Sequence, residues 1–419
     1  MPTALVTGAT GLAGNAIVQL LLSKPEWTKV ITLSRSRQVP AHPKNTHLTV
    51  NLCGAPRSII EAIKDDVQGL EYVIFCAYLA DPNPDRAYDL NVQMLQTFIT
   101  ALRQSGAMVT LKRVILVTGL KQYGVQLGRP KLPMHETDPW LEGDPWPKNF
   151  YYGQQKTLIE SAREDSDGWS WVVTYPQDII GVARGNFMNL ATALGLYLSV
   201  SAASGDGEIP FPGARETYLA FNCWTSARLH AEFCVWAALT PAAGNQGFNV
   251  TNGDTESWQH LWPKLVQRYS GKIPPVMFPG GDTGAYGEFE AWHSVSQFTP
   301  AIAKHEERIG LKGEFSGRPN VVHQQIDTLK WSQRPEVRAK WEELRERFEL
   351  EQETWEKATW RFATFLLGRE FSCVVSMSKA RRLGWTGYVD TWDAFEETLD
   401  ALEREGILPP ANRLRVANL

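Results

Sequence analysis

The sequence is poor in the residues that build metal centres and disulfide frameworks. Its 419 residues include five cysteines and eight histidines, and neither type recurs at the short spacings that are typical of metal ligands or redox pairs. The cysteines are scattered along the chain, as Cys53, Cys76, Cys223, Cys234 and Cys373. We therefore expect free thiols in a reducing compartment, without a metal site.

An excess of positive charge and a long hydrophobic run are also missing. The formal net charge is −4, which argues against nucleic acid or an anionic membrane as a general partner. The best apolar stretch, residues 191–200, is far shorter than a membrane span. The chain starts almost inside its first expected strand, which leaves no room for a signal peptide. We expect a cytoplasmic protein whose partner is a small molecule, and the sequence leaves open whether it forms a homodimer.

A glycine-rich segment near the N-terminus predicts a dinucleotide site. Residues 4–6 predict a strand and residues 16–22 an apolar helix. Between them, the first glycine makes the turn, the second lets the backbone approach a pyrophosphate, and the third lets the helix pack on the strand. The pyrophosphate would lie at the helix N-terminus, where free N–H groups and the helix dipole favour an anion. The candidate cofactor contacts here are Thr7, Gly8, Thr10, Gly11, Leu12, Ala13 and Gly14.

The second expected strand indicates which dinucleotide binds. Residues 30–33 are followed by Ser34 and Arg35, and no Asp or Glu stands there to accept hydrogen bonds from the ribose hydroxyls of NAD. Arg35 offers a planar guanidinium to a 2′-phosphate, and Ser34 is an additional donor. A solvated basic turn is the alternative interpretation. We therefore expect NADPH as the cofactor.

Strand and helix patterns alternate over the first part of the chain. This alternation predicts an α/β fold with a Rossmann-type, doubly wound parallel sheet and crossover helices. Cofactor sites in such sheets lie at the carboxyl ends of the strands. Further candidate cofactor contacts at or near these positions are Asn51, Leu52, Asn91, Thr118 and Ile179.

The character of the chain changes after about residue 180. We expect an NADP-binding Rossmann domain over residues 1–180, with a returning strand near residues 246–254, and a smaller, mostly helical substrate-binding region over residues 181–419. Residues 276–325 are richer in glycine, proline and polar residues, which favours a variable loop or lid. The 16 tryptophans are expected mainly in the core, with a few lining a large apolar pocket.

One predicted helix pairs a tyrosine with a lysine. Tyr152 and Lys156 are four residues apart and therefore share one helix face. A nearby ammonium stabilises phenolate and lowers a tyrosine pKa from about 10 towards neutrality. A phenol tuned in this way can donate a proton during a reduction. Most such pairs are ordinary helix neighbours. The catalytic interpretation of this pair therefore depends on the glycine-rich segment upstream.

Five short motifs along the chain form a specific combination. They are T-G-x-K-x-Y from Thr118, P-x-x-E-x-x-P from Pro133, N-F-Y-Y from Asn149, F-N-V-T-N-G-D from Phe248 and the segment that begins at Met377. The combination resembles the progesterone 5β-reductase/iridoid synthase family of atypical short-chain dehydrogenases, and the resemblance covers nearly the whole chain. It implies NADPH-dependent reduction of the C=C bond of an enone or enal.

The resemblance also assigns roles to single residues. The catalytic pair of the family, carried over residue by residue, falls on Lys121 and Tyr152. Extended short-chain dehydrogenases usually have a serine that binds the substrate carbonyl where this chain has Gly119. The chain departs from the family pattern at Lys156, which is the ordinary short-chain dehydrogenase lysine. The sequence leaves open which lysine is catalytic, because Lys156 could instead hold the nicotinamide ribose.

Two further residues are candidates for the substrate pocket. Tyr78 stands at the end of an expected strand, where the family tends to have tryptophan, so the pocket is expected to differ there. Met188 lies in a segment that continues the resemblance.

Three functional hypotheses follow. The leading one is an NADPH-dependent reductase of an activated C=C bond in a bulky apolar molecule. The second is a carbonyl reductase or another extended short-chain dehydrogenase activity, which the pair Tyr152 and Lys156 favours and the missing serine at Gly119 disfavours. The third is a non-catalytic protein that senses NADPH.

Overall fold

The computed structural model describes most of the chain. The described residues are 2–35, 39, 41–165, 168–184, 188–204, 207–279, 287–289, 299–315 and 322–414. Much of the expected loop or lid over residues 276–325 lies outside them, namely residues 280–286, 290–298 and 316–321. The expectation of a lid therefore stays a prediction.

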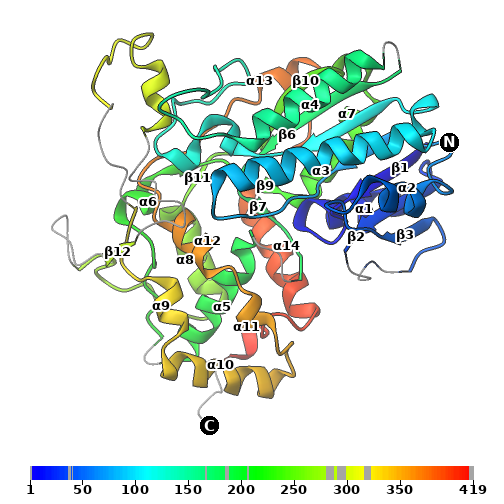
Figure 1. Cartoon of the computed structure of the whole chain (residues 1–419). Helices are drawn as coiled ribbons and strands as arrows, with labels where there is room; N and C mark the ends of the chain where they lie inside the picture. The colour runs from blue at the N-terminus through cyan, green and yellow to red at the C-terminus, as the bar shows by residue number, and fades with distance from the viewer. Residues whose placement is uncertain are drawn as a thin grey trace.

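A seven-stranded parallel sheet takes six strands from residues 3–176 and a seventh from residues 246–250 (Figure 1). Its strands are β1 (Thr3–Thr7), β2 (Lys29–Ser34), β3 (Asn45–Thr49), β4 (Tyr72–Phe75), β5 (Arg113–Val117), β6 (Ser170–Pro176) and β10 (Gln246–Val250). The spatial order is β10-β6-β5-β4-β1-β2-β3. The chain runs outward from β1 to β3 and then crosses to β4 on the other side of β1, which leaves a crevice at the carboxyl ends of these strands. The predicted doubly wound Rossmann fold is confirmed.

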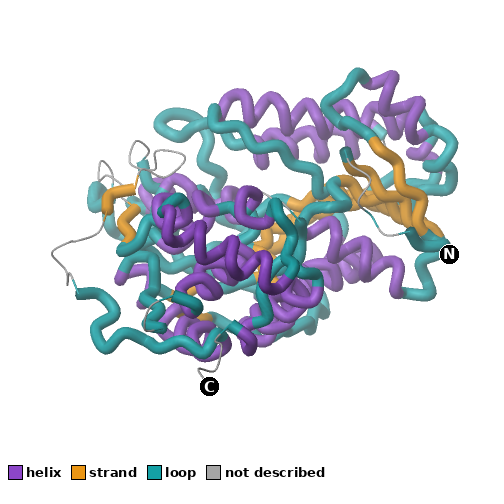
Figure 2. Tube along the Cα trace, turned by 90° about the horizontal axis from the view of Figure 1, so that it is seen from below, coloured by secondary structure: helices purple, strands orange, loops and turns teal. Residues whose placement is uncertain are grey.

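Helical layers cover both faces of the sheet, as Figure 2 shows. The helices are α1 (Leu12–Ser23) and α7 (Ala227–Leu239) on one face, and α2 (Pro56–Ile63), α3 (Pro84–Gln104) and α4 (Phe150–Glu164) on the other. Side chains alternate between the two faces of a strand. Accordingly, Ala4 and Val6 belong to the core with α1 and α7, while Leu5 belongs to the core with α2 and α3. Burial on both faces explains why the strands are short, continuous apolar runs.

The other helices form a region that lies mostly below the sheet in Figure 1. They are α5 (Leu190–Ala202), α6 (Arg215–Leu219), α8 (Trp258–Arg268), α9 (Thr328–Ser332), α10 (Pro335–Phe348), α11 (Thr354–Lys357), α12 (Trp360–Leu367) and α14 (Thr391–Arg404). The short helix α13 (Ser378–Arg382) lies instead beside β10, near the top of Figure 1. The short strands are β7 (Ile179–Ile180), β8 (Phe221–Asn222), β9 (Thr225–Ser226), β11 (Glu256–Ser257), β12 (Gly287–Phe289) and β13 (Val322–Gln324). Within the described ranges, no helix combines the length and apolar character needed to cross a membrane.

Tryptophan rings join the helices of this region. Trp355 of α11 lies 5.9 Å from Trp331 of α9 and 4.9 Å from Trp360 of α12, measured between ring centroids. Trp341 of α10 stacks on Trp355 at 5.3 Å. All four rings are buried, and each large side chain removed from water contributes roughly 2–3 kcal/mol. The expected packing role is confirmed for these tryptophans.

Candidate active site

A cavity of about 550 Å³ lies at the carboxyl ends of the sheet strands. Its walls come from the exits of β1, β2, β4, β5 and β6, from the first turns of α1 and α4, and from α12. The Rossmann sheet and the helical region therefore both contribute to one site. Cavities of this size with a few convergent polar groups are typical of small-molecule sites.

The glycine loop packs closely against the exit of β4 and leaves the start of α1 without a side-chain cap. Gly8 has a φ of +61°, a left-handed conformation that glycine adopts without strain. A Cβ on Gly8 would lie 2.8 Å from the backbone oxygen of Cys76. Gly11 is the N-cap of α1, and no described side chain caps this helix, so its first N–H groups remain available to an anion. The predicted contacts that line the cavity here are Gly8, Thr10, Gly11, Leu12, Ala13 and Gly14.

Two predicted cofactor contacts have structural roles instead. The hydroxyl oxygen of Thr7 accepts hydrogen bonds from the N–H groups of Cys76 and Ala77 at 3.1 and 3.2 Å, which ties β1 to the exit of β4. The amide of the buried Asn91 donates to the backbone oxygen of Leu79 and accepts from its N–H group. Neither residue lines the cavity, because the backbone after β4 occupies their polar groups. This placement corrects the prediction for both side chains.

The end of the cavity at β2 carries the predicted determinants of cofactor choice. Ser34 and Arg35 both line it, with Ser34 buried and Arg35 exposed at the mouth. Asn51 and Leu52, which follow β3, complete this end. A planar guanidinium at this position suits the 2′-phosphate that distinguishes NADPH from NADH.

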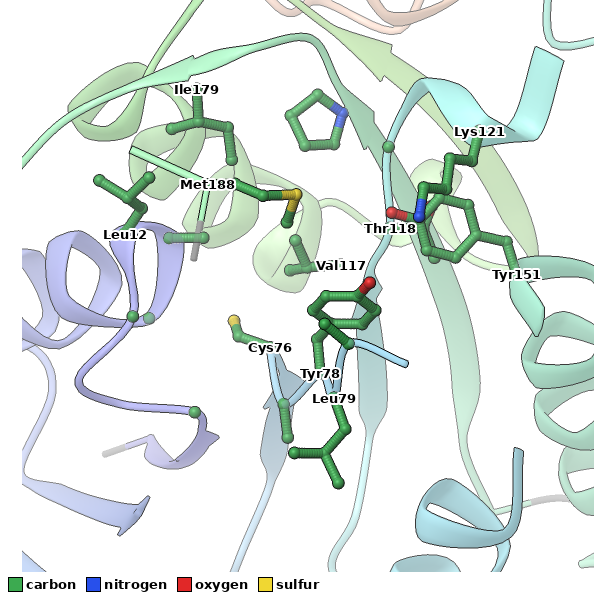
Figure 3. Close-up of a pocket in the computed structure, with 18 of the residues that line it drawn as sticks. Leu12, Cys76, Tyr78, Leu79, Val117, Thr118, Lys121, Tyr151, Ile179 and Met188 are labelled. Atoms are coloured by element: carbon green, nitrogen blue, oxygen red, sulfur yellow. The ribbon is translucent and has the colours of Figure 1, made fainter. Parts of the chain in front are cut away.

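Aromatic and apolar side chains form the opposite end of the cavity. The predicted residues that line it are Tyr78, Thr118, Lys121, Ile179 and Met188. Figure 3 shows Lys121 and Tyr151 next to each other at the exit of β5, with Tyr78 below them. Phe150 at the start of α4, together with Phe362, Phe365 and Leu366 of α12, completes the wall.

Tyr151, and not Tyr152, is the tyrosine of α4 that lines the cavity. Asn149 accepts a hydrogen bond from the N–H group of Tyr151 at 3.0 Å, which fixes the first turn of the helix. Successive helix residues point about 100° apart, so Tyr152 is turned into the core. Its hydroxyl donates to the backbone oxygen of Gln122 at 2.7 Å and accepts from the N–H group of Leu141 at 3.1 Å. The prediction of Tyr152 as catalytic residue and cofactor contact is corrected, because Tyr152 lies outside the cavity and Tyr151 is the phenol that lines it.

Lys156 also lies outside the cavity. Its side chain is 51% exposed and forms an ion pair with Glu142 at 2.6 Å. The residue one turn after Tyr151 is Gln155, whose amide donates to the side-chain oxygen of Gln122 at 2.8 Å. The helix therefore presents a tyrosine without the lysine of the ordinary Y-x-x-x-K pattern. Lys156 is corrected from a catalytic and cofactor-binding candidate to a surface residue.

Lys121 places an ammonium group in the cavity next to Tyr151. It lies on a turn after β5, and the side chain of Asn149 fixes that turn by donating to the backbone oxygen of Lys121 at 2.7 Å. Lys121 Nζ lies 5.5 Å from the ring centroid of Phe150 and 5.8 Å from that of Tyr78, within the range of cation–π attraction. Within the described part of the chain, no hydrogen bond or ion pair engages this Nζ. The ammonium is therefore available to a ligand.

Burial dominates the ionisation of these side chains. It lowers the pKa of Lys121 from 10.5 to about 8 and raises the pKa of Tyr78 and of Tyr152 from 10.0 to about 12. The pKa of Tyr151 is also raised, first by burial and then by the neighbouring phenol of Tyr78. The expectation of a lowered tyrosine pKa is wrong, because burial raises the pKa of Tyr152 more than its hydrogen bonds lower it. The phenols therefore stay protonated at neutral pH and act as hydrogen-bond donors.

Two parts of the cavity wall were not predicted. Arg369, just after α12, is buried and forms an ion pair with Asp178 after β6, and both line the cavity. Their separation of 191 residues leaves no local pattern that could connect them. Phe362 and Phe365 share a face of α12 at i,i+3 spacing. That spacing is a signal that could have placed this face against an apolar site.

Comparisons with known proteins agree with this architecture. A model of a family described as a PRISE-like Rossmann-fold domain matches residues 4–314. An uncharacterised protein of Schizosaccharomyces pombe is 34% identical over 97% of this chain and 98% of its own length. A 3-oxo-Delta(4,5)-steroid 5-beta-reductase of Arabidopsis thaliana is 25% identical over 97% and 93%. The UDP-glucose 4-epimerase of Thermotoga maritima has a TM-score of 0.58 at 14% identity over 96% and 99%, which shows a shared fold.

Proposed function

This chain belongs to the PRISE-like Rossmann-fold family, and we propose that it is an NADPH-dependent reductase of the activated C=C bond in an enone or enal. One observation carries the proposal: the ammonium of Lys121 and the phenol of Tyr151 meet in an apolar cavity beside a glycine-loop site. The name of the Arabidopsis relative describes reduction of a 3-oxo-Delta(4,5)-steroid, which contains an enone.

The residues present fit a dinucleotide. A Cβ at Gly8 would meet the backbone of Cys76 and one at Gly14 would meet the backbone of Gly8, so glycine at both positions keeps the loop packed tightly between β1, β4 and α1. The N–H groups at the start of α1 would hold the pyrophosphate, and Arg35 would hold the 2′-phosphate. NADPH, when bound, supplies the hydride.

The polar groups of the site suit 1,4-addition. When a new C–H bond forms at the β-carbon, the electron pair of the C=C bond moves towards the carbonyl, and negative charge builds on its oxygen. Tyr151 donates a hydrogen bond to that oxygen, and the ammonium of Lys121 stabilises the charge as it develops. Because burial raises the pKa of Tyr151, the phenol keeps its proton and acts as a donor. A proton from solvent then completes the saturated α-carbon.

The walls of the cavity favour a bulky apolar substrate. Phe150, Met188, Phe362 and Phe365 line the same cavity as Tyr151. Burying apolar surface against these side chains contributes roughly 25 cal/mol per Å², whereas a charged group would lose its hydration there. The wall thus favours a large substrate of low polarity, and Tyr151 and Lys121 orient its carbonyl group.

Carbonyl reduction and simple NADPH sensing are less well supported. The sequence feature that favoured carbonyl reduction was the pair Tyr152 and Lys156, and neither residue lines the cavity. Gly119 leaves that position without the serine that extended short-chain dehydrogenases usually have. A sensor would have no need of an unpaired ammonium beside a phenol in an apolar cavity.

We also propose a cytoplasmic location. All five cysteines carry free thiols, which suits a reducing compartment. Fractionation of cells that express the tagged full chain tests this location directly.

Product analysis tests the proposed function. The purified protein is incubated with NADPH or NADH and a panel of apolar cyclic enones, enals and matched saturated ketones, and products are identified by mass spectrometry. We expect saturated ketones and aldehydes, formed with NADPH and not from the saturated controls. Allylic alcohols as the main products, or equal turnover of saturated ketones, would show that the carbonyl is the group reduced. Absence of turnover across the panel despite NADPH binding would favour the sensor.

A further inference from the structure

The exit of β5 offers no second hydroxyl to a substrate carbonyl. The hydroxyl of Thr118 donates to the backbone oxygen of Thr174 at 2.9 Å and is buried. A Cβ at Gly119 would lie 3.4 Å from the hydroxyl oxygen of Tyr151 and 3.3 Å from the backbone oxygen of Pro176, so a larger side chain there would crowd Tyr151. Oxyanion sites are most effective when several donors converge on the developing charge. A second donor, if present, must come from another strand.

Tyr78 extends from the adjacent strand towards the same place. β4 and β5 are parallel neighbours in which Phe75 pairs with Leu116. Three residues beyond this pair are Tyr78 on one chain segment and Gly119 on the other. The phenol of Tyr78 thus approaches the space next to the residue that lacks a side chain.

Two contacts hold the ring of Tyr78. The ring stacks on Phe150 at 5.4 Å with an angle of 22° between the planes, and Lys121 Nζ lies 5.8 Å from its centroid. Figure 3 shows the hydroxyls of Tyr78 and Tyr151 pointing into the same part of the cavity, where the side chain of Lys121 ends. The electrostatic influence of the Tyr78 phenol on Tyr151 agrees with this proximity.

We infer that Tyr78 is a second catalytic hydrogen-bond donor, which binds the carbonyl oxygen of the enone across the cavity from Tyr151. It supplies from β4 the hydroxyl that Gly119 cannot supply from β5. The inference rests on the proposed reduction of an enone. Two phenols and one ammonium then surround the oxygen on which charge develops, and Tyr78 forms and breaks no covalent bond.

Kinetics of Tyr78→Phe test this role, because the variant retains the stacked ring and loses only the hydroxyl. Removing one donor from an oxyanion site lowers kcat by about 100-fold, and we expect a loss of about 10-fold to 100-fold here, with KM and NADPH affinity near the wild-type values. Tyr88→Phe is the matched control, because Tyr88 packs against the same apolar cluster as Tyr78 and does not line the cavity. Equal kcat for Tyr78→Phe and wild type would overturn the inference.

A binding probe separates this inference from the proposed function. 4-Nitrophenolate is a planar oxyanion whose absorbance reports hydrogen bonding, and it is titrated against the NADP⁺-loaded protein. We expect its affinity to fall at least about fivefold in Tyr78→Phe and in Tyr151→Phe, and to stay unchanged in Tyr88→Phe. If the wild type reduces no enone but the probe still depends on Tyr78, the oxyanion site stands and the proposed reaction fails. The inferred oxyanion site is wrong if 4-nitrophenolate binds Tyr78→Phe as tightly as it binds the wild type, or if it does not bind the wild type.

Discussion

Tyr151 and Tyr152 are consecutive residues of helix α4, but their hydroxyl groups end in different surroundings. Tyr151 lines the cavity beside Gly119. The hydroxyl of Tyr152 is bonded to the backbone of Gln122 at 2.7 Å, and its ring stacks on Trp140 at 4.7 Å. The capped first turn of α4 therefore directs the phenol of Tyr151 into the cavity and the phenol of Tyr152 into the core.

Phenylalanine at each position is expected to separate the two roles. Tyr151→Phe should lower kcat by about 100-fold or more, because a donor to the developing charge is lost. Tyr152→Phe should keep kcat near wild type and lower the free energy of unfolding by about 1–2 kcal/mol, because buried backbone groups lose their partner. Steady-state kinetics and urea unfolding measure the two effects. A folded Tyr152→Phe protein without turnover would return the catalytic role to Tyr152.

Lys121 is expected to control the rate, and Lys156 is not. Lys121→Met should slow enone reduction by about 10-fold to 1,000-fold, because the charge on the carbonyl oxygen loses its cation. In the wild type, kcat should decline as pH rises through about 8, where Lys121 loses its proton, and this decline should disappear in Lys121→Met. Lys156→Met is the matched control, with an exposed side chain outside the cavity. A lowered kcat in Lys156→Met together with a wild-type kcat in Lys121→Met would refute this assignment.

Lys121 is also expected to lower the free energy of unfolding. The pKa of Lys121 is lowered on folding from 10.5 to about 8, so the folded chain binds fewer protons than the unfolded chain between these values. Its contribution to the free energy of unfolding therefore rises with pH through this window, and the full penalty is present below about pH 8. We expect Lys121→Met to be more stable than wild type at pH 7 and this advantage to shrink towards pH 10. Urea unfolding across this pH range gives the comparison, and an advantage that grows with pH would contradict it.

Arg35 is expected to select the cofactor. Arg35→Ala should weaken NADPH binding by about 10-fold to 100-fold, since a charge-assisted contact to the 2′-phosphate is lost. NADH binding should stay nearly unchanged. Arg57→Ala provides a control, because Arg57 is exposed on the neighbouring α2 and does not line the cavity. Titrations of tryptophan fluorescence measure both affinities, and equal losses for the two cofactors would remove Arg35 from this role.

Gly8 is expected to be irreplaceable for both folding and cofactor binding. Gly8→Ala combines a left-handed backbone with a Cβ placed 2.8 Å from the backbone oxygen of Cys76. Gly69→Ala is matched in conformation, with a φ of +73°, but its Cβ would meet no atom within 4 Å. Conformation alone costs about 1–2 kcal/mol, so Gly69→Ala should lose that much stability and Gly8→Ala should lose more, together with NADPH affinity. Thermal unfolding with and without NADPH distinguishes the two.

The fold and the cofactor end of the cavity could be predicted because their signals are local. The glycine spacing places a turn between β1 and α1, and Arg35 follows β2 directly. In both cases, the residues that act together are near each other in the chain. Their geometry follows from one strand exit and one helix start.

The substrate end could not be predicted as well, because its geometry depends on distant contacts. The register of the two tyrosines depends on the cap by Asn149 and on its bond to the turn at Lys121. The pairing of Asp178 with Arg369 joins segments 191 residues apart. The direction of the tyrosine pKa shift depends on burial, which a sequence pattern does not specify.

The position of a transferred deuterium tests the central claim most directly. NADPH carrying deuterium at both C4 positions is incubated with the wild-type protein and an apolar enone, and the product is examined by NMR. The proposed reaction predicts one deuterium on the β-carbon of a saturated ketone. Deuterium on the carbinol carbon of an allylic alcohol would contradict it and identify the protein as a carbonyl reductase.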